Sequence, residues 1–332
     1  MQYTKYGNSG LEVSRVCLGA MTFVNTMEEK DAADLLRRCY DRGLNFIDTA
    51  DSYKESEAVL GRIMKGLRQD MVISTKVYAS NYNGRRRGAN TSRHHIIDAI
   101  NESLRELQTD YIDIYMCHHP DPLTPFEETY STLDNLVKQG KIRYIAMCNS
   151  YAWQVAYALG LCAKNGWEPP VSVQVAYNMI DRIAEIETLP MARRFNLMLQ
   201  SYGPQARGIL AGKFTRETGF PEEMCTHINP RIRARCNEEV FGILDVMQEL
   251  CGKYNITLGQ LATAWIMARD PLFVPIVGGS KAEHLDPLMD VCEISLEQAD
   301  VDRLTELTAD YIYKPWMNQP NYMAPAVGYN RI

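Results

Sequence analysis

A carboxylate ends one of the apolar segments of this chain. In the stretch NFIDTADSY, residues 45–53, Phe46 and Ile47 precede Asp48, and Tyr53 follows five positions later. A buried carboxylate without a partner is costly enough that it normally pairs with a cation or takes up a proton. The next apolar segment, MVISTK, ends on Lys76, which is therefore the candidate partner of Asp48.

Polar residues recur at the ends of the strand-like segments. In chain order these residues are Asp48, Lys76, His118, Asn149, Gln174 and Tyr202. A single polar residue at such a place usually meets solvent, but a whole series is hard to ascribe to chance. If the strands run parallel, their C-terminal ends share one face, and these side chains form the polar floor of a pocket.

Asp48, Tyr53, Lys76 and His118 suit general acid catalysis on a carbonyl group that is being reduced. An ammonium next to a phenol stabilises the phenolate and lowers the phenol pKa from its reference near ~10. Lys76 would therefore make Tyr53 a better proton donor, and Asp48 would keep Lys76 charged. His118 would hold the substrate oxygen or share the proton. Acyl transfer is disfavoured, since no Ser or Cys beside His118 lies in a nucleophile turn.

Strand-like and helix-like segments alternate along the chain. The strand-like segments cover residues 14–21, 45–48, 71–76, 111–117, 141–149, 171–178, 197–202 and 272–279. The helix-like segments carry apolar residues at helical spacing and capping residues such as Ser92, and the last of the series is expected near residues 281–290. This alternation predicts a parallel sheet closed into a (β/α)8 TIM barrel. A doubly wound open sheet is the alternative, but no GxGxxG motif follows the first strand.

We expect one α/β domain over residues 1–310 and an irregular C-terminal tail over residues 311–332. The tail carries Tyr311, Tyr313, Trp316, Tyr322 and Tyr329, interrupted by Pro315, Pro320 and Pro325. The prolines exclude a helix of useful length, and so many aromatic rings are unfavourable in water. Trp316 is predicted to lie at the rim of the pocket. Packing under the barrel or at a subunit contact is the alternative.

The composition fits a globular protein that binds neither nucleic acid nor a membrane. The 332 residues are 46% hydrophobic and 23% charged, with a net charge of −6. The sequence contains no transmembrane run and no secretory signal, and its nine cysteines without a CxxC pair indicate a cytoplasmic protein. No metal is expected, because His118 and His119 should point to opposite faces of a strand and no further ligand set follows.

Several motifs carry a family resemblance. FIDTADSY, ISTK, DYIDIYMCHHPDP, GKIRYIAMCNS and SYGPQARGILAGKF strongly resemble the aldo-keto reductase superfamily. The resemblance implies a catalytic tetrad of Asp48, Tyr53, Lys76 and His118, with Tyr53 as the general acid. It also implies a TIM barrel that binds NADP(H), or NAD(H), without a metal. Such a protein transfers a hydride between nicotinamide and a small carbonyl or alcohol substrate, such as an aldehyde, a ketone or a keto-sugar.

The same resemblance implies which residues bind the cofactor. Asn149 and Gln174 match the residues that hold the nicotinamide carboxamide, and Tyr202 matches the aromatic residue that stacks on the nicotinamide ring. The full implied set is Gly19, Thr22, Asp48, Asn149, Gln174, Tyr202, Gly203, Gln205, Ser280, Lys281 and His284, with Ser280 and Lys281 at the 2′-phosphate. Cys148 replaces the usual serine before Asn149, and Gly203 replaces a hydroxyl donor near the pyrophosphate.

Two other functions compete with that of an NADP(H)-dependent reductase. Channel-associated β subunits also resemble this family, so a cofactor-sensing subunit without catalysis is one alternative, although the complete tetrad argues against it. A Schiff-base aldolase with Lys76 as the nucleophile is the other, but Asp48 would keep that lysine protonated. A homo-oligomer is compatible with either enzyme.

Overall fold

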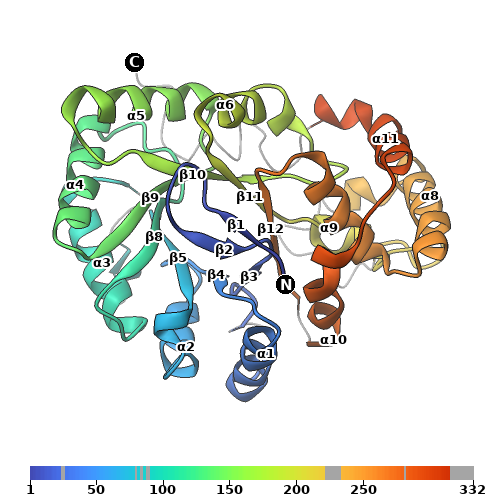
Figure 1. Cartoon of the computed structure of the whole chain (residues 1–332), viewed down its shortest axis with the longest axis horizontal. Coiled ribbons are helices and arrows are strands. Elements are labelled where there is room, and N and C mark those ends of the chain that lie inside the picture. Colours follow the sequence, from blue (N-terminus) through green and yellow to red (C-terminus); the bar gives the residue numbers. More distant parts are fainter. Residues whose placement is uncertain are drawn as a thin grey trace.

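The computed structural model is a closed barrel of parallel strands surrounded by helices (Figure 1). The structure describes residues 1–23, 27–78, 81–82, 85–86, 90–220, 233–279 and 282–314. Around the barrel the strands follow the order β3, β4, β5, β8, β9, β10, β11, β12, and β12 pairs with β3 to close the ring. These strands correspond to the predicted strand-like segments in chain order, so the prediction of a (β/α)8 TIM barrel is confirmed.

The barrel strands are short, and most of the helices are longer. The strands are β1 Tyr3–Lys5, β2 Glu12–Ser14, β3 Cys17–Gly19, β4 Phe46–Asp48, β5 Val72–Val77, β6 Asn81–Tyr82, β7 Arg85–Arg86, β8 Ile112–Cys117, β9 Ile142–Cys148, β10 Pro170–Ala176, β11 Met198–Tyr202 and β12 Phe273–Val277. The helices are α1 Glu29–Asp41, α2 Ser56–Ile63, α3 Arg93–Glu106, α4 Phe126–Lys138, α5 Ala152–Asn165, α6 Thr188–Phe195, α8 Glu238–Tyr254, α9 Leu258–Arg269, α10 Ala282–Leu285 and α11 Gln298–Leu307.

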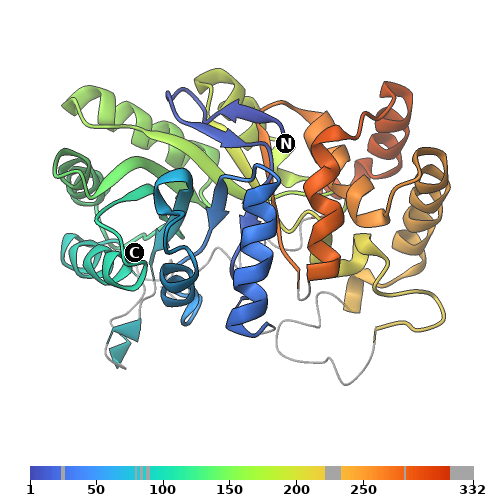
Figure 2. The ribbon, with the colours of Figure 1, turned by 60° about the horizontal axis from the view of Figure 1, so that its bottom comes forward.

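The helices stand along the outside of the strands (Figure 2). Their starts follow local side-chain chemistry, because the first amide groups of a helix have no partner within it. Oγ of Ser92 accepts a hydrogen bond from the amide of His95 at the start of α3, as the sequence predicts. Thr257 caps α9 in the same way by accepting from the amide of Gln260.

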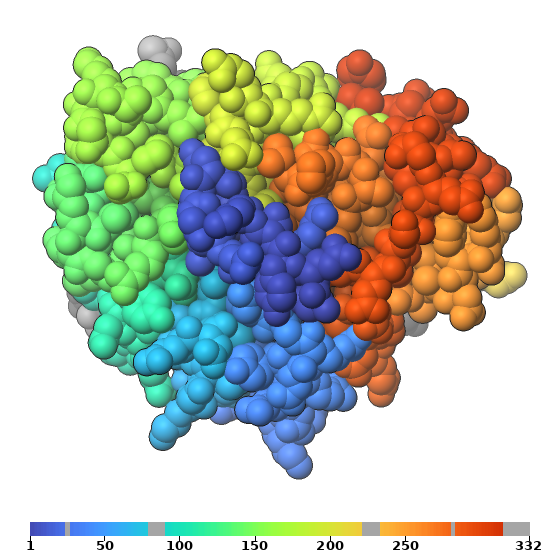
Figure 3. Space-filling model, viewed as in Figure 1, coloured from blue at the N-terminus to red at the C-terminus, as the bar shows by residue number. Residues whose placement is uncertain are grey.

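A hairpin of β1 and β2 closes the N-terminal end of the barrel. Figure 3 shows the first residues of the chain across the middle of that face. Tyr6 is fully buried behind the hairpin, and its hydroxyl lies 2.6 Å from Oγ of Ser172 and 2.6 Å from Oε1 of Gln200. Its ring also meets Phe46 edge to face. A ligand therefore has to enter from the opposite end, where the strands terminate.

Alternation along the strands separates the interior of the barrel from the layer under the helices. In β4, Phe46 packs inside the barrel and Ile47 packs in the outer layer, so the side chain of Asp48 returns to the interior. In β5, Lys76 points inward to Asp48, whereas Thr75 points outward. The apolar interior therefore ends on a charged pair at the C-terminal ends of the strands.

The segment after β12 departs from the helix predicted over residues 281–290. The α-helix α10 ends at Leu285, and a 3₁₀ segment, η5 Asp286–Glu293, follows it. Pro287 accounts for the change, because it lacks an amide hydrogen and disfavours a helical conformation at the residue before it.

Some predictions concern residues that the structure does not describe. Ser280, Lys281 and the tail from Pro315 onward, including Trp316, lie outside the described residues. Within the described ranges, no helix is both long and apolar enough to cross a membrane.

Candidate active site

Asp48 and Lys76 form a buried ion pair at the ends of β4 and β5. Nζ of Lys76 donates to Oδ2 of Asp48 at 2.6 Å and to the carbonyl oxygen of Thr49 at 2.7 Å. Oδ1 of Asp48 accepts from Oγ of Ser74 at 2.6 Å and from Nε2 of Gln174 at 2.8 Å. Both carboxylate oxygens therefore have donors, which a buried charge requires.

The ion pair keeps Lys76 protonated. Burial by itself lowers the pKa of the Lys76 ammonium, but the Asp48 carboxylate, with smaller contributions from Tyr53 and Cys148, raises that pKa above its ordinary value. A lysine that stays charged cannot act as a nucleophilic amine. The geometry therefore disfavours the Schiff-base aldolase.

Tyr53 and His118 lie beside this ion pair. Nζ of Lys76 is 5.1 Å from the centre of the Tyr53 ring, and the Tyr53 and His118 rings meet edge to face with their centres 5.7 Å apart. Asp48 is the last residue of β4, Lys76 is the second-last residue of β5, His118 follows β8, and Tyr53 lies in the loop after β4. The fold thus brings together the four residues that the sequence proposes as a tetrad.

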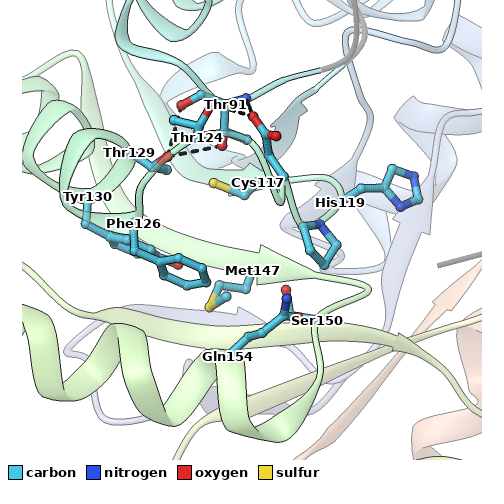
Figure 4. A pocket seen from close by; sticks show the side chains of 12 residues that line it. Thr91, Cys117, His119, Thr124, Phe126, Thr129, Tyr130, Met147, Ser150 and Gln154 are labelled. Atoms are coloured by element: carbon cyan, nitrogen blue, oxygen red, sulfur yellow. Dashed lines mark hydrogen bonds between the residues drawn. The ribbon is translucent and has the colours of Figure 1, made fainter. Parts of the chain in front are cut away.

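His118 and His119 stack on one another, so the prediction that they point to opposite faces is wrong. Their ring centres are 4.7 Å apart and their planes differ by 13°. Strand β8 ends at Cys117, so both histidines lie beyond the strand, where alternation no longer holds. His119 also lines a small cavity of about 20 Å³ (Figure 4). That volume holds about one water molecule and is too small for an organic substrate.

Both histidines are neutral near pH 7. Burial, reinforced by the positive charge of Lys76, lowers the pKa of His118 well below its ordinary value and the pKa of His119 to about 4. A neutral imidazole offers one N–H donor and one nitrogen acceptor. His118 is therefore suited to hydrogen-bond a substrate oxygen, but it is not a cation.

Asn149, Gln174 and Tyr202 form a connected group next to the ion pair. The Tyr202 hydroxyl donates to Oδ1 of Asn149 at 2.8 Å, and Nδ2 of Asn149 donates to the carbonyl oxygen of His118 at 3.0 Å. Sγ of Cys148 lies between the two amides, 3.2 Å from Nδ2 of Asn149 and 3.6 Å from Oε1 of Gln174. Because Nε2 of Gln174 donates to Asp48, its carbonyl oxygen faces the thiol. The amide orientations are thus fixed by their neighbours.

A cavity of about 1040 Å³ opens at this end of the barrel. The predicted residues that line it are Gly19, Thr22, Asp48, Tyr53, His118, Asn149, Gln174, Tyr202, Gly203, Gln205 and His284. Lys76 is fully buried, and it contacts Asp48 and Tyr53, which line the cavity. The volume exceeds the ~300–1,000 Å³ of most small-molecule pockets. It can therefore accommodate an extended ligand such as a dinucleotide together with a small substrate.

Two cationic side chains at the cavity were not predicted from the sequence. Arg207 and Lys213 both line it, and neither forms an ion pair with a carboxylate in the described part of the chain. Arg207 has a φ of 59°, and Lys213 lies so close to Gly208 that an added Cβ there would come within 3.1 Å of its Cδ. Both residues belong to the motif SYGPQARGILAGKF, so the positive charge of that motif was the signal that could have identified them.

A buried glutamate behind β5 was also missed. Glu57 of α2 is 2% exposed, and its carboxyl oxygens lie 2.6 Å from Oγ1 of Thr75 and 3.2 Å from Oγ of Ser103. Burial raises the pKa of Glu57 to about 8, against the effect of the Thr75 hydrogen bond. Thr75 precedes Lys76, so this contact supports the strand end that carries the ion pair.

Glu57 makes the stability of the protein depend on pH. The folded protein keeps the Glu57 proton up to about pH 8, whereas the unfolded chain releases it near the ordinary glutamate pKa of 4.5. The free energy of unfolding therefore falls as the pH rises through that window, by up to ~1.4 kcal/mol per pH unit.

The substitution Glu57→Gln removes this titration. The free energy of unfolding of E57Q minus that of the wild type, measured by urea titration, should grow by at least ~2 kcal/mol between about pH 5 and about pH 8. Glu55→Gln, an exposed control in the same segment, should show no such trend, and parallel curves for E57Q would contradict the assignment.

Within the described ranges, no group of three or more His, Cys, Asp or Glu side chains is placed to hold a metal ion. The barrel places its polar group at the C-terminal ends of the strands, which is where the active sites of TIM barrels lie. The chain belongs to the aldo/keto reductase family, whose model matches residues 15–309.

Known proteins are similar to this chain over most of its length. Versiconal hemiacetal acetate reductase of Aspergillus parasiticus is 31% identical, over 92% of this chain and 96% of that protein. The aldo-keto reductase YhdN of Bacillus subtilis is 29% identical, over 98% of both chains. A probable voltage-gated potassium channel subunit beta of Oryza sativa is 32% identical, over 86% of this chain and 89% of that protein.

Proposed function

We propose that this oxidoreductase reduces a small carbonyl compound with NADP(H), and that Tyr53 is the general acid. The observation that carries the proposal is the hydrogen-bonded Asp48–Lys76 pair, which lies against the ring of Tyr53 at the floor of a large cavity. The family supports the oxidoreductase.

Four residues of the chain have separate roles in the proposed reduction. When bound, the nicotinamide cofactor supplies a hydride to the carbonyl carbon. Tyr53 donates its hydroxyl proton to the carbonyl oxygen, which becomes the hydroxyl of the alcohol product. Lys76 stabilises the phenolate that remains on Tyr53, and Asp48 holds Lys76 in place. His118 hydrogen-bonds the substrate oxygen and orients the carbonyl group.

The residues around the cavity fit a nicotinamide dinucleotide. Asn149 and Gln174 would hold the carboxamide, and Tyr202 would stack on the ring. Gly203 has a φ of 68° and no atom within 4 Å of the place of a Cβ, so the chain can pass close to a ligand there. Arg207 and Lys213 would pair with the phosphates.

NADP(H) is preferred over NAD(H) in this proposal because the sequence places Ser280 and Lys281 after β12. The hydroxyl of Ser280 and the ammonium of Lys281 would recognise a 2′-phosphate, which only NADP(H) carries. His284, which lines the cavity on α10, would lie beside the same end of the cofactor.

A panel of aldehydes, ketones and keto-sugars tests the proposal. We expect loss of NADPH absorbance at 340 nm that requires both the protein and a carbonyl compound, with a lower KM for NADPH than for NADH. The similarity to a channel subunit beta supports a second candidate, a subunit that binds the cofactor without turnover. Tight NADPH binding with no reduction across the whole panel would favour that candidate and contradict the reductase.

A further inference from the structure

Ser52 contacts the ring of His118. Its Oγ lies 3.3 Å from Nδ1 of His118, and its side chain lines the same large cavity. Ser52 directly precedes Tyr53 in the loop after β4, so one loop carries both the proposed acid and a contact to the neighbouring histidine. Nothing in the proposed function uses Ser52.

The ring nitrogen that carries the hydrogen determines whether His118 can donate a hydrogen bond to a substrate. Its imidazole is neutral, so only one of the two ring nitrogens carries a hydrogen. In such a ring, the partner of one nitrogen determines whether the other nitrogen donates or accepts. The direction of the hydrogen bond at Nδ1 therefore sets the chemistry of Nε2: where Nδ1 accepts, Nε2 carries the hydrogen.

Nε2 is the ring nitrogen left for a substrate. In the part of the chain that the structure describes, the His118 ring has its hydrogen bond at Nδ1, and Nε2 has none. The ring lines the cavity and is held by the parallel stack with His119 and the edge contact with Tyr53. These ring contacts fix the plane of the imidazole but not its tautomer, because neither is a hydrogen bond.

Carbonyl reduction needs a donor at Nε2. Negative charge develops on the carbonyl oxygen as the hydride arrives at the carbon, so an Nε2–H group stabilises it and an Nε2 lone pair repels it. A neutral ring with its hydrogen on Nε2 has an acceptor at Nδ1. The Ser52 hydroxyl is the donor within reach of that acceptor.

We propose that Ser52 is a positioning residue, which donates its hydroxyl hydrogen to Nδ1 of His118 and thereby holds His118 as the Nε2–H tautomer that faces the substrate oxygen. This inference rests on the proposed function, since the need for a donor comes from carbonyl reduction. It adds a residue outside the four proposed catalytic residues, and it assigns a proton to a named atom.

The tautomer can be measured directly. We suggest recording ¹⁵N chemical shifts of the histidine rings in cofactor-free protein labelled with ¹⁵N-histidine, and identifying the His118 signals by their loss in His118→Gln. In the wild type we expect an unprotonated Nδ1 and a protonated Nε2. Ser52→Ala should shift the His118 signals toward a mixture of tautomers, whereas Ser52→Thr, which keeps the hydroxyl, should retain the wild-type shifts.

Kinetics supply the second measurement. Ser52→Ala should lower kcat/KM for an aldehyde about three- to tenfold, the usual effect of losing one hydrogen bond, while the Kd of NADPH stays unchanged. Ser52→Thr should restore most of the rate. Ser150→Ala is the matched control, because its hydroxyl bonds the carbonyl oxygen of Cys148 at 3.2 Å and does not touch the His118 ring.

Two results would overturn the inference. One is a protonated Nδ1 in the wild type, and the other is a Ser52→Ala variant with unchanged His118 shifts and unchanged kcat/KM. A wild type that reduces carbonyl compounds but carries the hydrogen on Nδ1 would refute the role of Ser52 and leave the proposed function intact. A wild type that shows the Nε2–H tautomer but reduces no carbonyl compound would refute the proposed function alone.

Discussion

Replacing Tyr53 by Phe should lower kcat at least ~10²-fold while the Kd of NADPH stays within about twofold, because a general acid typically contributes roughly 10²–10⁴-fold to a rate. The substitution removes one hydroxyl and keeps the ring that lies 5.1 Å from Nζ of Lys76. The Asp48–Lys76 pair has its own hydrogen bonds and should persist. Steady-state kinetics at saturating NADPH and a fluorescence titration of the cofactor give the two quantities.

The control for this substitution is Tyr157→Phe. Tyr157 is a half-exposed tyrosine of α5 whose hydroxyl bonds Glu127 on the surface. Its loss should leave kcat within about twofold of the wild type. A Tyr53→Phe variant that keeps more than about a tenth of the wild-type kcat would assign the acid to another group.

Replacing Lys76 by Met should destabilise the fold by about 3–5 kcal/mol, because it leaves the Asp48 carboxylate buried without its cation. Lys76 is fully buried and Asp48 is 4% exposed, so water cannot take over the role of the ammonium. Ser74 and Gln174 would remain as the donors to Asp48. The free energy of unfolding, measured by urea titration at pH 7, tests this expectation.

The double variant Asp48→Asn/Lys76→Met separates charge from packing. It buries no unpaired charge, so it should be more stable than Lys76→Met alone, although it lacks both charged groups. Lys213→Met removes an exposed cation at the same cavity and should change the free energy of unfolding by less than about 0.5 kcal/mol. If Lys76→Met were as stable as Lys213→Met, the ion pair would not bear on the stability of the barrel.

The barrel could be predicted from the sequence because its signals are local and repeated. Each barrel strand is a short apolar segment followed by helical periodicity, and parallel strands then force their C-terminal ends onto one face. The same rule predicts that Asp48, Lys76 and His118, which belong to three separate segments, lie at one end of the barrel. Their mutual contacts follow from the order of the strands, since β4, β5 and β8 are neighbours in the barrel.

Three other features of the site could not be predicted, because they depend on contacts that no local sequence pattern indicates. The stacking of His118 on His119 depends on β8 ending at Cys117, and strand ends are harder to place than strands. The burial of Glu57 and the contact of Ser52 with His118 join segments that are distant in the sequence. A serine in a loop or a glutamate in a helix is usually a surface residue, so neither residue type gave a reason to single it out.

The measurement that tests the central claim most directly is the transfer of deuterium from NADPH labelled at C4 of the nicotinamide to a carbonyl compound that the protein reduces. Direct hydride transfer beside Tyr53 predicts one deuterium on the carbinol carbon of the alcohol, with incorporation that is stereospecific for one face of the nicotinamide and slowed in Tyr53→Phe to the same extent as kcat. Mass spectrometry and proton NMR of the product give the number and position of the deuterium atoms. An alcohol without deuterium at that carbon, or labelled product formed equally fast by Tyr53→Phe, would contradict the account.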